Sequence, residues 1–282
     1  MKCRLASKED LLTLKELWYE CFLEYDSQAS IDYYFSKELN LATTFVLEVN
    51  NEIVTSLQLN QHQIWYNNHL EEVSFVIGVA TFTKHRKKGY MKVLLEFAIN
   101  YAKEVYQQKF MILQAYDWNI YRPFGFFAAY YKREIGLSLA RLSKYQLANE
   151  AVLSEKLLLE IYQKYTQNLN GYKIRNKEYF RAKNKMSAID GIEVFCSNDA
   201  YIYYEIKDHN LIISECAFSQ FSKLLELVSA LVTKIKVNKV KLTCDLLNTR
   251  DMTGTKQLFM MVKELSNDKF EIAEQLYISE WI

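Results

Sequence analysis

The fold of this chain is decided by VIGVATFTKHRKKGYMKVLL, residues 76–95 of 282. The stretch begins as an apolar strand, passes through a cationic loop, crosses Gly89 and enters an amphipathic helix. At such a junction the N–H groups of the first helical turn lack intrahelical acceptors, and the peptide dipoles place about half a positive charge there. Phosphate and pyrophosphate groups bind at helix ends of this kind. We therefore expect a diphosphate-binding turn between a central strand and its helix.

The charges of this loop support an anion site. Lys84, Arg86, Lys87 and Lys88 offer positive charge, and Gly89 permits close approach of the backbone. The alternative is a solvated basic turn or a weak nucleic-acid patch. The strand before the run and the helix after it favour the anion site. The net charge of the whole chain is +1, so no global field attracts nucleic acid or an anionic membrane, and we expect neither as a partner.

The remaining sequence predicts an α/β protein in which one order of elements occurs twice. Expected strands are residues 4–6, 44–49, 53–66, 70–82, 110–115, 192–196, 201–206, 211–218, 240–244 and 258–262. Expected helices are residues 7–22, 30–39, 90–107, 154–167, 177–183 and 220–234, the first of them capped by Ser7. The repeat indicates two similarly folded halves, 1–140 and 141–282. The second half has no glycine or basic residue at its strand-to-helix junction, residues 216–222, so one diphosphate site is expected per chain.

Several classes of protein are disfavoured by the composition. The N-terminus does not resemble a secretory signal, and the longest apolar run is too short to span a bilayer. The five cysteines are scattered without CxxC spacing, as expected for reduced thiols in a cytoplasmic protein. Neither an HExxH pair nor a G-x-S-x-G elbow occurs, and no metal site is expected.

The 76–95 segment resembles motif A of the GNAT superfamily of N-acetyltransferases, whose loop reads R/Q-x-x-G-x-G/A. Arg86, Gly89 and Met91 stand at the three marked positions. A second stretch, AYDWNIYRPFGF at residues 115–126, resembles motif B, where an aromatic hydroxyl precedes a Gly-Phe pair by four residues. The resemblance implies a mixed, mostly antiparallel sheet with a splayed parallel strand pair flanked by helices. It also implies acetyl-CoA as co-substrate and an amine as acceptor, either a small molecule or a peptide.

The same resemblance implies roles for individual residues. Tyr121 would stabilise the departing thiolate. The residues expected to contact the coenzyme are Val79, Ala80, Thr81, Arg86, Lys87, Lys88, Gly89, Tyr90, Met91, Lys92, Tyr116 and Asp117.

Residues 85–89 and 120–126 together look most like the Eis-type acetyltransferases, which have two acetyltransferase-like halves and a third, sterol-carrier-like domain. Only a remnant of that domain, from about Lys256, is expected here. The family uses its terminal carboxylate as the base, which implies this role for Ile282. From the residues alone the rivals are Asp26, His69, Glu71 and Glu72.

Two other functions remain open at this stage. One is a transferase with a different acyl donor, and the other is a non-catalytic acyl-CoA-binding sensor. The oligomeric state stays open between a monomer and a homo-oligomer.

Overall fold

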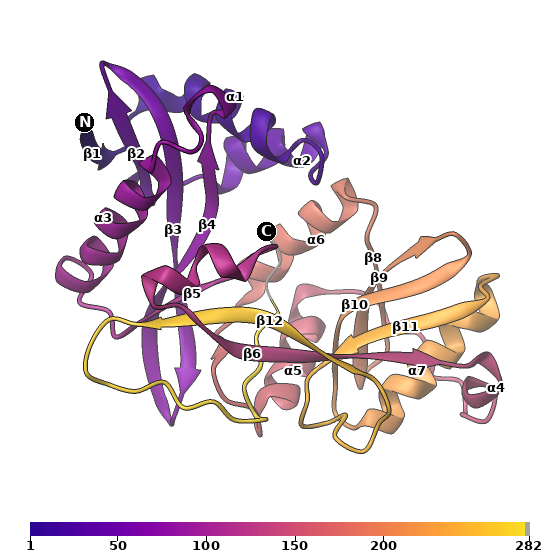
Figure 1. Ribbon diagram of the computed structural model, residues 1–282. Helices are drawn as coiled ribbons and strands as arrows, with labels where there is room; N and C mark the ends of the chain where they lie inside the picture. Colours follow the sequence, from indigo (N-terminus) through magenta and orange to yellow (C-terminus); the bar gives the residue numbers. More distant parts are fainter. Residues whose placement is uncertain (280–282) are drawn as a thin grey trace.

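A computed structural model describes residues 1–279 of the chain (Figure 1). The described strands are β1 Lys2–Leu5, β2 Thr44–Val49, β3 Glu52–Tyr66, β4 His69–Thr81, β5 Phe110–Leu113, β6 Phe127–Leu137, β7 Tyr172–Lys173, β8 Glu193–Cys196, β9 Ala200–Lys207, β10 Asn210–Phe218, β11 Lys239–Cys244 and β12 Thr255–Glu264. The α-helices are α1 Leu11–Phe22, α2 Gln28–Tyr33, α3 Tyr90–Glu104, α4 Leu139–Leu142, α5 Glu155–Thr166, α6 Lys177–Ile189 and α7 Phe221–Lys234. Short 3-10 or π turns are η1 Lys8–Asp10, η2 Tyr34–Glu38, η3 Leu41–Thr43, η4 Thr83–His85, η5 Trp118–Ile120 and η6 Arg122–Phe124.

Local signals explain where the first elements begin. Ser7 and Asp10 form a capping box in which the Ser7 N–H donates to Asp10 Oδ2 at 2.7 Å. The expected turns at residues 50–51 and 67–68 each have two asparagines with positive φ, the conformation that joins antiparallel strands in a two-residue hairpin. These turns set the register of the meander β2–β3–β4.

All the strands on the main path belong to one sheet, in the order β1-β2-β3-β4-β5-β12-β6-β11-β10-β9-β8, with β7 pairing to β3. The pairs β4–β5 and β10–β11 are parallel and the other pairs are antiparallel. The expected mixed, mostly antiparallel fold is therefore confirmed. Each parallel pair is joined by a helix, α3 in the first case and α7 in the second.

The side chains of β4 alternate between two cores. Phe75 and Ile77 pack in a cluster with Trp18 of α1 and Ile31 of α2. Val76 packs in another cluster with Leu94 and Leu95 of α3. Because alternate residues of a strand face opposite sides of a sheet, α3 covers one face and α1 with α2 the other (Figure 1).

One strand was not predicted from the sequence, and another, expected at 258–262, lies in an unexpected place. No strand was expected at 127–137, yet β6 runs through both parts of the sheet, pairing with β12 along one edge and with β11 along the other. Residues from about Lys256, expected to be a remnant of a third domain, instead form β12 in the middle of the N-terminal strands. The N-terminal sheet is thus completed by a strand from the far end of the chain.

Candidate active site

The site begins at a β-bulge in β4. Gln58 is opposite Ile77 and Ser56 is opposite Ala80, so two β4 residues, Gly78 and Val79, face one residue of β3. Gly78 has φ of +57°, which an L-residue adopts only with strain. The sequence analysis did not single out Gly78, although a lone glycine inside a strand pattern is a signal for a bulge.

Next to the bulge, the two parallel strands separate. β4 pairs with β5 only from Ser74 to Val76, and β5 ends at Leu113, opposite Val76. The last five residues of β4, Ile77–Thr81, therefore run beyond the register of β5. An extended ligand can use the backbone of such a strand, as a peptide does when it adds to a sheet edge.

The loop after β4 has the geometry expected of an anion site. Gly89, at the N-cap of α3, has φ of +80°, and a methyl group added there would meet no atom within 4 Å. Lys87 also has positive φ, at +62°. Open space therefore lies beside the Cα of Gly89, at the start of α3, where the first N–H groups have no intrahelical acceptors.

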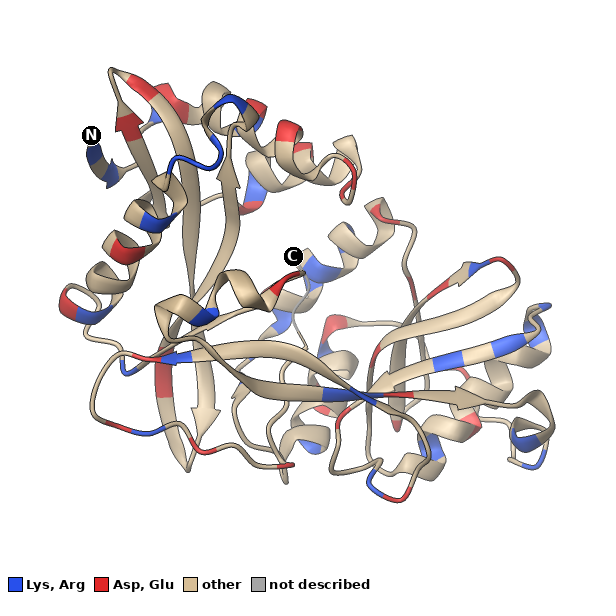
Figure 2. Cartoon of the chain, viewed as in Figure 1, with Lys and Arg blue, Asp and Glu red and all other residues tan. Residues whose placement is uncertain are grey.

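Figure 2 marks the Lys and Arg positions of the loop between β4 and α3 in blue. The side chains of these residues differ in their partners. Lys84 forms an ion pair with Glu52. Arg86 donates through Nε to the Thr81 carbonyl at 3.1 Å. Lys87 and Lys88 are exposed and form no ion pair within residues 1–279. Arg86, Lys87 and Lys88 thus carry positive charge that no carboxylate among the described residues pairs with, where the sequence analysis had counted four cations.

Tyr121 lies between two 3-10 turns, η5 and η6. Its half-buried ring packs on the cluster that Val79, Tyr90 and Met91 also contact. Its hydroxyl has no hydrogen-bond partner among the described residues. Burial raises the pKa of Tyr121 to about 12. The structure thus brings Tyr121, the bulge and the start of α3 to one hydrophobic cluster.

The other two residues expected at the coenzyme lie elsewhere around the opening. Tyr116 is 86% exposed and stacks on Tyr25 with ring centroids 4.9 Å apart. The carboxylate of Asp117 accepts from the Asn119 N–H at 3.0 Å and so caps η5. Both follow the C-terminal end of β5, on the far side of the gap from the basic loop.

The C-terminal strand also contributes to this region. Lys263 of β12 lies beneath the turn that follows Tyr121, and a methyl group at Gly125 would be 3.0 Å from its Nζ. Gly125 has φ of +83° at the end of η6. Both this left-handed backbone conformation and the nearby Lys263 side chain favour glycine at the position.

Three of the four rival bases are at the wrong end of β4. His69, Glu71 and Glu72 precede Gly78 by at least six residues, or about 20 Å along an extended strand. Glu71 pairs with Lys109 at 2.7 Å, and Glu72 accepts from Gln63. The fourth rival, Asp26, is in the loop between α1 and α2.

The second half contains a comparable strand pair whose gap is filled. β10 has a bulge at Ser214 and continues beyond its register with β11. The Tyr165 hydroxyl donates to Asp245, just past the end of β11. The Tyr165 ring packs against the rings of Phe218 and Tyr277, with ring centroids 4.8 and 5.2 Å away. Side chains thus fill the space between these two strands of the second half.

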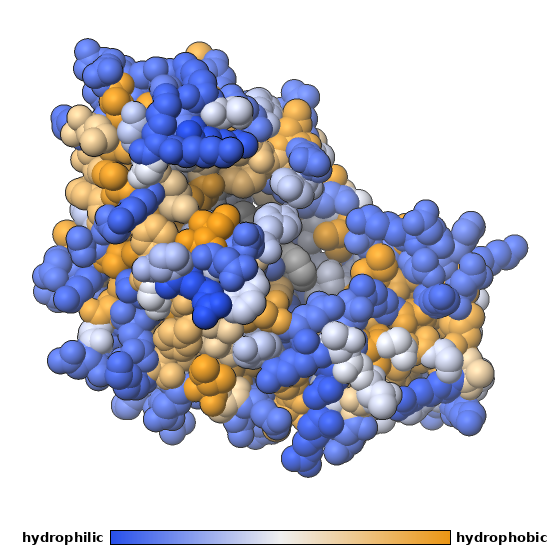
Figure 3. Space-filling view, in the orientation of Figure 1, coloured by the Kyte–Doolittle hydropathy of each residue, from blue (hydrophilic) through white to orange (hydrophobic). Residues whose placement is uncertain are grey.

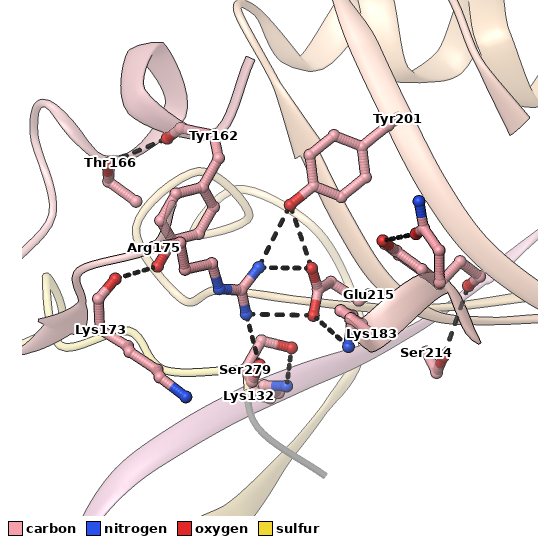
Figure 4. Close-up of polar contacts among 12 residues, drawn as sticks. Lys132, Tyr162, Thr166, Lys173, Arg175, Lys183, Tyr201, Ser214, Glu215 and Ser279 are labelled. Carbon is pink, nitrogen blue, oxygen red and sulfur yellow. Dashed lines mark hydrogen bonds and ion pairs between the residues drawn. The ribbon is translucent and has the colours of Figure 1, made fainter. Parts of the chain in front are cut away.

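The described chain ends at Ser279, which is buried by a cluster of charged side chains (Figure 4). Arg175 donates to the Ser279 carbonyl at 2.5 Å, and the Lys132 ammonium donates to Ser279 Oγ at 3.0 Å. Glu215 binds Arg175 at 2.7 Å and Lys183 at 3.2 Å. Burial alone would raise the pKa of the Glu215 carboxyl, but Arg175 and Lys183 hold this pKa well below its usual range. Segment 276–279 is therefore firmly fixed.

Ile282, the residue implied as base by the resemblance, lies outside the described residues. The space-filling view shows a recess between the N-terminal part and the second half of the molecule (Figure 3).

Within residues 1–279, no group of three or more His, Cys, Asp or Glu side chains is arranged to hold a metal ion. The helices in that part of the chain are also too short or too polar to cross a membrane.

Comparison with known proteins gives one family and several similar folds. Residues 2–129 match the family model described as an acetyltransferase (GNAT) domain. No curated protein matches the sequence. Similar solved structures include a probable N-acyltransferase from Enterococcus faecalis V583 (12% identity, TM-score 0.76, covering 94% of this chain and 72% of the other) and Eis1 from Mycobacterium abscessus (14%, 0.73, 94% and 74%). The N-myristoyltransferase of Saccharomyces cerevisiae with bound myristoyl-CoA is similar at 8% identity and TM-score 0.57, covering 93% and 78%. At these identities the likeness shows the fold.

Proposed function

We propose that the chain moves an acetyl group from acetyl-CoA to a primary amine, since residues 2–129 match the family model of an acetyltransferase (GNAT) domain. The observation that carries the proposal is the stretch 77–81 of β4, which runs beyond its pairing with β5 and leads toward the N-terminus of α3. The expected cytoplasmic location and the halves 1–140 and 141–282 belong to the same proposal.

In this proposal the coenzyme binds along β4. Its pantetheine arm pairs with the backbone of Val79–Thr81, and its diphosphate meets Lys87, Lys88 and the first N–H groups of α3. A backbone N–H near Val79 or Ala80 donates a hydrogen bond to the thioester carbonyl oxygen. The amine attacks directly in a ternary complex, and Tyr121 donates a hydrogen bond to the departing thiolate. No covalent enzyme intermediate is needed.

Calorimetry of acetyl-CoA binding tests the coenzyme site. The double variant Lys87→Ala/Lys88→Ala should bind acetyl-CoA on the order of 10-fold more weakly, because two charge-assisted contacts to phosphate are lost. Lys84→Ala is the matched control: it removes a lysine of the same run that is already paired with Glu52. Equal weakening by both variants would mean that the loop acts through general charge rather than as a built diphosphate site.

Thiol release over a panel of amines tests the transfer. The panel is a lysine derivative, a polyamine, an aminoglycoside and a small aromatic amine. Tight acetyl-CoA binding without thiol release from any of them would favour a non-catalytic sensor. A different acyl donor is the second candidate, because the similar yeast fold holds myristoyl-CoA. Release from a longer acyl-CoA but not from acetyl-CoA would favour it.

A further inference from the structure

The proposed acetyl transfer fixes the direction of the coenzyme along β4. In that proposal the diphosphate lies at the start of α3, beyond the last residue of β4, and the pantetheine arm pairs with residues 79–81. The acyl group is at the other end of the coenzyme, so it points back along β4 toward Gly78 and Val76. The side chains around this part of the strand therefore decide how long the acyl group can be.

The paired part of β5 limits the acyl group at its far end. β4 pairs with β5 as far as Val76, which is opposite Leu113, the last residue of β5. An acyl carbon level with Gly78 is two residues from this point, or about 7 Å. A contact distance of about 4 Å at the far end leaves about 3 Å, which is room for about one or two further carbons. A longer chain has to turn toward one face of the sheet.

On the face covered by α1 and α2, the bulge is closed by the buried indole of Trp18. A methyl group added at Gly78 would be 2.8 Å from Trp18 Cη2, so the indole occupies the place that a side chain would take. The rings of Phe22 and Tyr34 lie with centroids 5.0 Å from the indole, and the Phe35 ring meets it edge-on at 5.6 Å. An indole held by three rings cannot move aside without losing this packing.

Gln58 of β3 closes the rest of the same position. Its Nε2 would be 3.4 Å from the methyl group added at Gly78, and its side chain is buried. The Tyr34 hydroxyl donates a hydrogen bond to Gln58 Oε1. Tyr34 thus stacks on Trp18 and also fixes Gln58, so one tyrosine holds both side chains that cover Gly78.

The opposite face, covered by α3, is also packed at this level of the strand. Val76 and Leu113 are buried in its hydrophobic cluster, and Val79 and Tyr121 pack against that cluster. In the proposed transfer the Tyr121 hydroxyl lies beside the departing thiolate, so this side of the thioester is taken. A chain that turns away from the end of β5 therefore meets Trp18 on one face and the Tyr121 cluster on the other.

We propose that Trp18 is a specificity-determining residue that restricts the donor to short acyl groups, of about two or three carbons. This inference rests on the proposed acetyl transfer and deepens it, because it names the side chain that excludes longer acyl-CoA donors. The indole acts only by the volume it occupies beside Gly78. It makes and breaks no bond in the transfer.

Thiol release from acetyl-CoA and octanoyl-CoA with the same amine tests this role. In the wild type, kcat/KM for octanoyl-CoA should be about 100-fold below that for acetyl-CoA. Trp18→Leu and Trp18→Ala should each raise the octanoyl-to-acetyl ratio of kcat/KM about 10-fold or more, because they remove part or all of the wall. Both donors are measured on one preparation, so the ratio does not depend on how much of a variant is folded. Trp65→Leu, the same substitution near the far end of β3, is the matched control and should leave the ratio unchanged.

Calorimetry without an acceptor measures donor selection separately from transfer. Octanoyl-CoA should bind the wild type more weakly than acetyl-CoA does, and the two Kd values should approach each other in both Trp18 variants. The role of Trp18 would be overturned if the wild type used both donors within about threefold, or if neither variant changed the ratio. Selective binding of acetyl-CoA without thiol release from any amine would remove the transfer and keep the selection. A chain that binds neither donor would remove both.

Discussion

Tyr121→Phe is the variant that most directly tests how the thiolate leaves. Burial raises the pKa of Tyr121 to about 12, whereas the thiol that departs has a parent pKa near 8.5. Complete proton transfer from the hydroxyl to the thiolate is then uphill by about 5 kcal/mol, compared with about 2 for an ordinary tyrosine. Tyr121 should therefore stabilise the thiolate by donating a hydrogen bond and keep its own proton.

The expected loss on Tyr121→Phe is about 100-fold in kcat, with the acetyl-CoA Kd unchanged. Thiol release followed from pH 6 to 11 measures both the loss and the mechanism. Because the Tyr121 pKa is about 12, wild-type kcat should not fall near pH 10. A fall there that is absent from Tyr121→Phe would mean that the Tyr121 hydroxyl loses its proton near pH 10. Tyr101→Phe is the control, since its ring belongs to the same hydrophobic cluster. Unchanged turnover in Tyr121→Phe, or a tyrosine limb at pH 10, would refute the reasoning.

Three further outcomes follow from the fold. Gly78→Ala should destabilise the protein by about 2–4 kcal/mol in urea unfolding. The alanine would have to adopt a left-handed φ, and its methyl group would overlap the Trp18 ring. Wild-type stability of this variant would contradict the bulge. Burial lowers the pKa of Lys132 to about 7, whereas an exposed lysine in the unfolded chain has a pKa of about 10.4. Between these two pH values the Lys132 amine is protonated only in the unfolded chain. The free energy of unfolding therefore rises with pH over that range. Lys132→Met removes this contribution, so the wild-type free energy of unfolding minus that of the variant should rise by about 1 kcal/mol per pH unit over this range. Deleting β12 should abolish cooperative melting in calorimetry, since β5 and β6 lose their shared partner; a folded, coenzyme-binding remainder would show that the first half is independent.

Local pattern was sufficient wherever the structure depends on near neighbours in the chain. The strand Thr44–Val49 and the two asparagine turns were predicted from residues within a few positions of each other, and all are confirmed. The same is true of the basic turn before Tyr90, whose strand, glycine and helix lie within twenty residues. Period, capping and turn chemistry act over such distances, so they can be read directly from the chain.

Only the tertiary structure decided which distant segments meet. β6 escaped prediction because its inward positions include Lys132, which breaks the apolar alternation and is stable there only among the partners that folding supplies. The position of β12 between β5 and β6 depends on pairing across more than a hundred residues, which no local pattern encodes. The sequence by itself determined the basic turn and the elements around it, and long-range packing decided which side chains surround it.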